Sequence, residues 1–166
     1  LACSDLAGGG KDAKIPGDAL GTYHVIAALE TSTCGPGALG STDLWEFDVK
    51  LSRDGNDLYW LNGEEAIPGR IAADGTSFAF DTRAVVQAIP VGKGHPGCAI
   101  VRSDTANGTL SSPSVDVASF SGRMRFGYMP QAGSDCTTLV GVEGGFAFLP
   151  CEMSYLVKAD RTVEPE

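Results

Sequence analysis

The sequence lacks any long apolar run, because no stretch approaches the roughly 18 to 20 consecutive apolar residues that a membrane-spanning helix requires. It is also poor in positive charge, since 12 Lys and Arg stand against 21 Asp and Glu, for a net charge of -9. Such a chain repels the phosphates of nucleic acid and the anionic face of a bilayer. We therefore expect no membrane-crossing helix and no nucleic-acid partner.

Catalytic and metal-binding patterns are missing as well. The two histidines, His24 and His95, accompany no Gly-x-Ser-x-Gly motif, and a catalytic histidine needs a nucleophile and a carboxylate beside it. The cysteines form no C-x-x-C pair of the kind that binds zinc, and Asp54, Asp57 and Asp74 occupy turn positions outside any calcium-loop pattern. The sequence predicts a non-enzymatic protein with no catalytic residue, no metal site and no cofactor.

Composition disfavours long helices. Charged residues make up 20% of the chain, whereas 22 glycines are spread along it. Long helices favour periodic runs of Glu, Lys, Ala and Leu, so this composition favours short strands and tight turns. A length of 166 residues fits one domain better than two.

Apolar and polar residues alternate along several segments, which is the pattern of a strand buried on one face. In the clearest case, Trp45, Phe47, Val49 and Leu51 interleave with charged residues at 46, 48 and 50. The same period occurs over 23–29, 78–80, 120–128 and 153–159, and further strands are expected at 58–61, 67–71, 85–89, 98–102, 115–117, 138–142 and 146–148.

Asx-Gly pairs mark expected hairpin turns, because they supply the positive φ angles that tight turns need. The pairs are Asp54-Gly55, Asn62-Gly63, Asp74-Gly75 and Asn107-Gly108. Hairpins in series make an antiparallel meander, and strands spaced by roughly 8 to 12 residues are typical of barrels and sandwiches. We predict a single all-β domain of about ten strands closed as a barrel, with a two-sheet sandwich as the alternative.

Aromatic residues suggest a ligand site, and one of them belongs to a sequence that resembles a known family. Trp45 and Trp60 lie on the two arms of one predicted hairpin, and aromatics commonly line small-molecule pockets. Gly21-Thr22-Tyr23 is similar to the Gly-x-Trp sequence that opens the first strand of lipocalins, with Arg161 expected nearby at the end of the last strand. The resemblance implies a barrel without naming a ligand. Trp45, Trp60 and Tyr23 are the candidate ligand-binding residues, with core packing as the alternative.

The chain has five cysteines, an odd number that leaves one unpaired if the others form disulfides. Leu1-Ala2-Cys3 resembles the end of a bacterial lipobox, in which the cysteine is lipidated after signal-peptide cleavage, and the Gly-rich run through Lys14 predicts a flexible tether. The resemblance implies that residues 1–20 hold the lipidation site and tether, and that residues 21–166 form the β-domain. It also implies a membrane anchor at Cys3 in the bacterial envelope, at the outer membrane or cell surface. The alternative is an unlipidated Cys3 in an ordinary secreted domain.

Four cysteines remain, namely Cys34, Cys98, Cys136 and Cys151, and they allow three pairings. An oxidising compartment favours disulfides. We favour Cys34 with Cys98 and Cys136 with Cys151. Each cysteine lies beside a loop rich in Gly, Pro or Ser, at 31–42, 90–97 or 130–135, so the bridges should clamp these loops.

Arg123 and Arg125 alternate with the apolar residues of their strand. They predict a solvated strand face whose charges discourage edge pairing, with binding of an anionic partner as the alternative.

The leading functional prediction is a monomeric, non-enzymatic, lipid-anchored envelope protein whose disulfide-stabilised β-domain serves in binding or structural display, with an unknown protein as its partner. The alternative is a lipocalin-like carrier of a small apolar ligand. The carrier predicts an internal apolar cavity that is open at one end.

Overall fold

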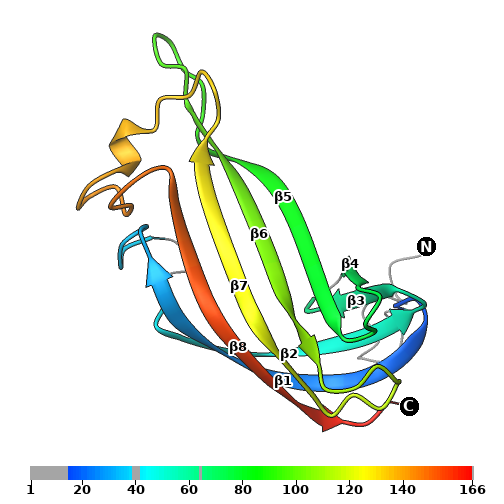
Figure 1. Ribbon diagram of the computed structural model, residues 1–166. Helices are drawn as coiled ribbons and strands as arrows, with labels where there is room; N and C mark the ends of the chain where they lie inside the picture. The colour runs from blue at the N-terminus through cyan, green and yellow to red at the C-terminus, as the bar shows by residue number, and fades with distance from the viewer. Residues whose placement is uncertain (1–14, 39–41, 64, 166) are drawn as a thin grey trace, which may run out of the picture.

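The computed structural model describes residues 15–38, 42–63 and 65–165. Within them, eight antiparallel strands form a closed barrel in chain order (Figure 1). The strands are β1 (Asp18–Ser32), β2 (Leu44–Asp54), β3 (Asp57–Leu61), β4 (Ala66–Ile71), β5 (Ser77–Ile89), β6 (Cys98–Leu110), β7 (Ser119–Pro130) and β8 (Cys151–Val163). The predicted all-β barrel is confirmed, with eight strands in place of about ten. Leu1-Ala2-Cys3 and the tether through Lys14 lie outside the described residues.

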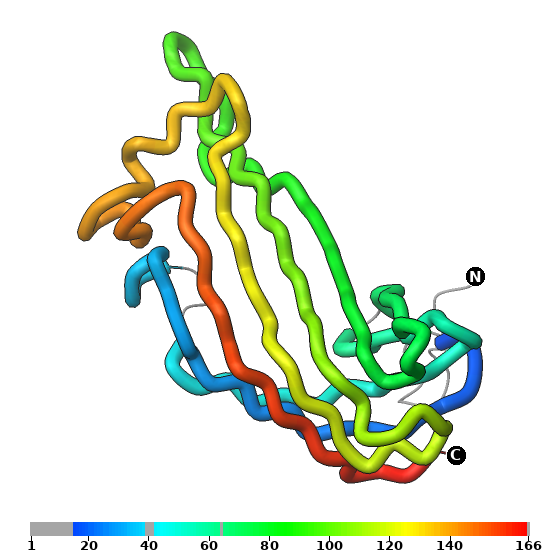
Figure 2. The backbone as a smooth tube through the Cα atoms, viewed as in Figure 1, coloured from blue at the N-terminus to red at the C-terminus, as the bar shows by residue number. Residues whose placement is uncertain are grey.

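The barrel closes through β1, which pairs with β2 on one side and with β8 on the other. The hairpin of β3 and β4 is much shorter than its neighbours, and Figure 2 shows that β5 to β8 extend well beyond it. As a result, residues 44–49 of β2 pair with β1 alone, and residues 81–89 of β5 pair with β6 alone. We call these two facing edges the seam. The barrel therefore has a closed end, beside β3 and β4, and an open end.

Three of the predicted strands are wrong, and two other predicted strands form one continuous strand in the structure. The segments at 78–80 and 85–89 belong to the continuous strand β5. Residues 115–117 lie in the β6–β7 loop, and 138–142 and 146–148 lie in the β7–β8 loop, which contains a short 3₁₀ helix (Thr137–Leu139) and one isolated bridge from Val140 to Phe146. Their apolar residues do not meet a neighbouring strand in a ladder, so sequence alternation alone was insufficient.

The predicted turn at Asn107-Gly108 is also wrong, because both residues lie inside β6. Gly108 is directly opposite Gly122 of β7, and a Cβ atom on Gly108 would lie 2.6 Å from the Cζ atom of Phe78. The glycine is required here by close packing. The other three pairs do connect strands, with Gly55 at φ 61° and Gly75 at φ 77°.

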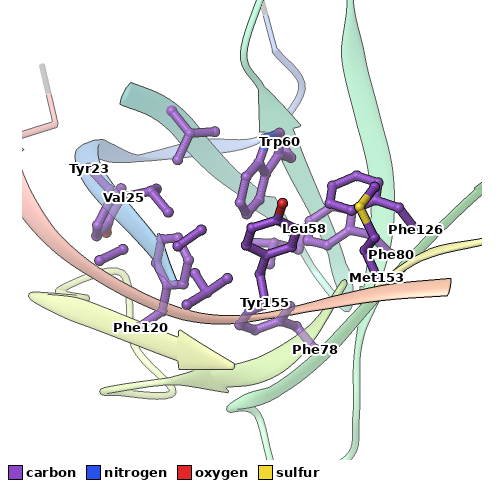
Figure 3. Packing of buried hydrophobic residues seen from close by; sticks show 14 of the residues in the cluster. Tyr23, Val25, Leu58, Trp60, Phe78, Phe80, Phe120, Phe126, Met153 and Tyr155 are labelled. Carbon is purple, nitrogen blue, oxygen red and sulfur yellow. The ribbon is translucent and has the colours of Figure 1, made fainter. Parts of the chain in front are cut away.

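The core fills the closed end with aromatic rings. The ring centroid of Trp60 lies 5.6 Å from that of Phe80 and 5.8 Å from that of Phe120. Figure 3 shows Tyr23 at one end of this cluster and Phe126 at the other. Side chains at the first end are fully buried, and those at the second border the open end.

Tyr23 anchors the closed end. Its hydroxyl donates to the carbonyl oxygens of Val117, at 2.6 Å, and Leu20, at 3.1 Å. Arg161 lies directly opposite Tyr23 in the β1–β8 ladder, as the lipocalin resemblance suggested. Its guanidinium also contacts Asp116 and Glu164. Burial raises the pKa of Tyr23 to about 12, and Arg161 acts in the opposite direction.

Tyr23→Phe should lower the free energy of unfolding at neutral pH by about 1 to 2 kcal/mol, because buried carbonyls lose their donor. The folded-state pKa of Tyr23 exceeds its ordinary value of 10, so the tyrosine's contribution is complete below pH 10 and is lost as pH rises toward 12. Urea unfolding of both proteins at several pH values should show their stabilities converging above pH 10. A difference that stays constant with pH would contradict this assignment.

An apolar cavity at the open end of the barrel

On the two strands that border the seam, the inward-facing residues become more exposed toward the open end. On β5, Phe78 and Phe80 are 6% exposed, whereas Val86, on the same inward face, is 49% exposed. On β2, Val49 and Leu51 are buried and Trp45 is half-buried. Because both strands lack a partner along the seam, the interior of the barrel reaches solvent there.

A cavity of about 800 Å³ occupies this region. We call it the open-end cavity. Its lining is mostly apolar and comes from the inward faces of β2, β5, β6, β7 and β8 and from the β1–β2 and β7–β8 loops. The described residues that line it are Gly37, Thr42, Trp45, Val86, Ala88, Ile100, Arg102, Phe126, Tyr128, Leu139, Gly144, Gly145, Phe146 and Met153.

Aromatic contacts shape the cavity wall. The ring of Trp45 lies 6.0 Å from that of Phe126 and 6.4 Å from that of Tyr155, measured between centroids. The ring of Tyr128 lies 5.5 Å from that of Phe146, which belongs to the β7–β8 loop. These contacts connect the barrel strands to the loop above them, so the wall is packed rather than loosely assembled.

Polar contacts hold the two loops over the strands. The Tyr155 hydroxyl donates to the Thr42 carbonyl oxygen at 2.9 Å and accepts from the Thr42 amide at 3.2 Å. In the β7–β8 loop, the amide of Ala147 donates to the carbonyl oxygen of Cys34 at 2.8 Å. The β1–β2 and β7–β8 loops are thereby joined to each other and to β8.

Two disulfides clamp the same loops. Cys34 pairs with Cys151, and Cys98 pairs with Cys136, with Cα–Cα distances of 5.0 Å and 4.9 Å. The favoured pairing of Cys34 with Cys98 and Cys136 with Cys151 is therefore wrong. Barrel closure explains the difference: β1 lies beside β8, so the ends of these strands bring Cys34 to Cys151, while β1 and β6 are not neighbours. Both bridges lie at the open end, and together they hold both sides of the β7–β8 loop.

Arg102 is the one charged side chain among the described residues that line the cavity. Its Nε atom donates to Asp104 Oδ1 at 2.8 Å, and its Cζ atom lies 5.5 Å from the centroid of the Phe126 ring. The hydrogen bond that Arg102 donates to Asp104 raises the pKa of Arg102 above its usual value, so the guanidinium stays charged. A fixed cation therefore lies at the edge of an apolar space.

Of the three predicted ligand-binding residues, one lines the cavity and two lie in the core. Trp45 lines the cavity, whereas Trp60 belongs to the aromatic core and Tyr23 is fully buried at the closed end. Sequence reasoning missed Arg102 and Phe126 as site residues. Strand parity contained the signal, because Cys98 and Ile100 face inward and Arg102 follows at the same period.

The other candidate residues lie away from the cavity. His24 is on an exposed face, where the Asp48 carboxylate, 2.9 Å from Nδ1, raises the pKa of the imidazole. His95 lies in the β5–β6 loop with Nε2 at 3.8 Å from Asp135. Arg123 forms a two-pronged ion pair with Glu30.

Among the described residues, no group of three or more His, Cys, Asp or Glu residues is placed to hold a metal ion. No helix in the described ranges is long and apolar enough to span a membrane.

Comparison of the chain with protein-family models, curated proteins and solved structures gives no match.

Proposed function

We propose that this protein binds a small apolar ligand in the open-end cavity and carries it in the cell envelope. The observation behind the proposal is the cavity itself, whose volume of about 800 Å³ falls within the range of roughly 300 to 1,000 Å³ typical of small-molecule sites. Its lining is dominated by apolar and aromatic groups, with few polar atoms to fix orientation. The unpaired seam supplies an entrance from solvent.

The two clamps on the loops support the same function. A cavity roofed by unrestrained loops would have to order them when a ligand binds, and that ordering lowers affinity. Here the Cys34–Cys151 and Cys98–Cys136 bridges restrain the loops before binding. The bridges also support an oxidising compartment outside the cytoplasm.

Anchoring at Cys3 stays a prediction within this proposal. Intact-mass measurement of protein purified from the membrane fraction should show a lipid-modified Cys3. An unmodified Cys3 would remove the anchor from the proposal while leaving the ligand site in place.

The neutral fluorophore N-phenyl-1-naphthylamine, which brightens in apolar surroundings, tests ligand binding directly. Wild-type protein should bind it saturably with one site per chain. Ala88→Trp should weaken binding about 10-fold or more, because the indole would displace ligand contact worth roughly two buried CH₂ groups at about 0.8 kcal/mol each.

Ala79→Trp provides the matched control, since Ala79 lies on the same strand but faces outward and is exposed. This variant should bind the fluorophore as wild type does. The proposal fails if wild-type protein gives no saturable signal, or if the two tryptophan variants bind equally.

A further inference from the structure

The position of Arg102 is unusual for the interior of a barrel. It occupies the inward face of β6 two residues beyond buried Ile100, and it faces Tyr128 directly across the β6–β7 ladder. Placing a charged side chain at the edge of an apolar cavity costs desolvation free energy. If this position served only to pack the interior, an apolar side chain would be favoured over arginine.

The guanidinium is held in a defined orientation. Asp104 accepts from Nε, and the Phe126 ring lies beneath Cζ at 5.5 Å. The terminal nitrogens Nη1 and Nη2 make no hydrogen bond to any described residue. Arg102 lines the cavity and Asp104 does not. The cavity therefore meets the positively charged member of the ion pair.

The free donors match a carboxylate. Guanidinium presents its N–H groups as a planar fork that fits the two oxygens of a carboxylate. A dianionic group is less suitable, because Asp104 lies next to Arg102 and the whole chain carries a net charge of -9. Tyr128, which lies opposite Arg102 in the ladder, also lines the cavity.

We infer that the ligand of the open-end cavity is an anionic amphiphile, an apolar molecule that ends in one carboxylate, and that the carboxylate binds Nη1 and Nη2 of Arg102. The inference rests on the proposed ligand-binding function. The apolar body would lie along Trp45, Phe126 and Met153, whose side chains line the same cavity.

Competition against N-phenyl-1-naphthylamine by decanoic acid and decan-1-ol tests this inference at neutral pH, because the two molecules share a chain and differ in charge. Wild-type protein should prefer the acid by about 10- to 100-fold, the range expected for hydrogen bonds to charged groups. Equal displacement by both molecules would overturn the carboxylate assignment while leaving apolar binding intact. If the fluorophore, the acid and the alcohol all fail to bind, the proposed function itself would be overturned.

Paired variants assign the preference to Arg102. Arg102→Met combined with Asp104→Asn removes both charges and leaves no orphaned carboxylate, and it should abolish the preference for the acid. Asp104→Asn alone should retain the preference for the acid. Arg125→Met should also retain it, because Arg125 lies at an outward position of β7. A double variant that still prefers the acid as strongly as wild type does would overturn the inference.

Discussion

Replacing Cys34 and Cys151 together by serine should lower the free energy of unfolding by about 5 kcal/mol. The bridge joins residues separated by 117 positions, and in the chain-entropy model a loop of this length restricts the unfolded chain strongly. Replacing Cys98 and Cys136, which are separated by 38 positions, should cost about 4 kcal/mol. Both losses are large beside the 5 to 15 kcal/mol that stabilises a typical domain.

Guanidinium unfolding of the two double variants, with the wild type as the reference, measures these losses. The Cys34 and Cys151 variant should have the lower midpoint. Wild-type protein treated with reductant should be less stable than either variant, because it lacks both bridges. Double variants as stable as wild type, or a peptide map that recovers Cys34 bound to Cys98, would contradict the assignment.

Gly122→Ala should destabilise the barrel by about 3 kcal/mol, at the upper end of the usual cost of overpacking. A Cβ atom at this position would lie 2.0 Å from the carbonyl oxygen of Asn107 and 2.6 Å from the Cα atom of Gly108. Both atoms belong to the backbone of β6, so relief requires the two strands to separate. Phe78, which packs over Gly108, would lose its contact as well.

Gly127→Ala is the matched control on the same strand. Its nearest atom to an added Cβ is the Ser103 carbonyl oxygen at 3.7 Å, an ordinary van der Waals distance. This variant should be neutral or more stable by about 0.4 to 1 kcal/mol, because alanine restricts the unfolded chain. Thermal unfolding compares the two variants. Equal midpoints would contradict the close-packing role of Gly122.

The sequence predicts the barrel well because strand alternation and turn chemistry are local. The alternation from Trp45 to Leu51 reflects one buried face of β2, and Asp74-Gly75 makes the turn that it predicts. In that turn, the Asp74 carboxylate accepts from the amides of Thr76 and Ser77. Each of these features depends on a few neighbouring residues.

The candidate site is harder to predict because it depends on strand lengths and on closure. The seam exists because β3 and β4 end before they reach the open end. No local sequence pattern predicts where along its length a strand has no neighbouring strand. The disulfide pairing follows from the contact between β1 and β8, which joins the two ends of the chain. Arg102 could have been placed inside by counting parity from Cys98, but its contact with Phe126 requires the β6–β7 register.

Contact quenching of Trp45 tests ligand entry into the open-end cavity most directly. The chain has two tryptophans, so Trp60→Phe leaves Trp45 as the sole emitter and Trp45→Phe leaves Trp60. We expect 10-bromodecan-1-ol, whose bromine quenches at short range, to quench Trp45 saturably and to leave Trp60 bright, because Trp45 lines the cavity and Trp60 lies in the core. Unchanged Trp45 emission up to the solubility limit of the alcohol, or equal quenching of both tryptophans, would contradict a ligand site at the open end.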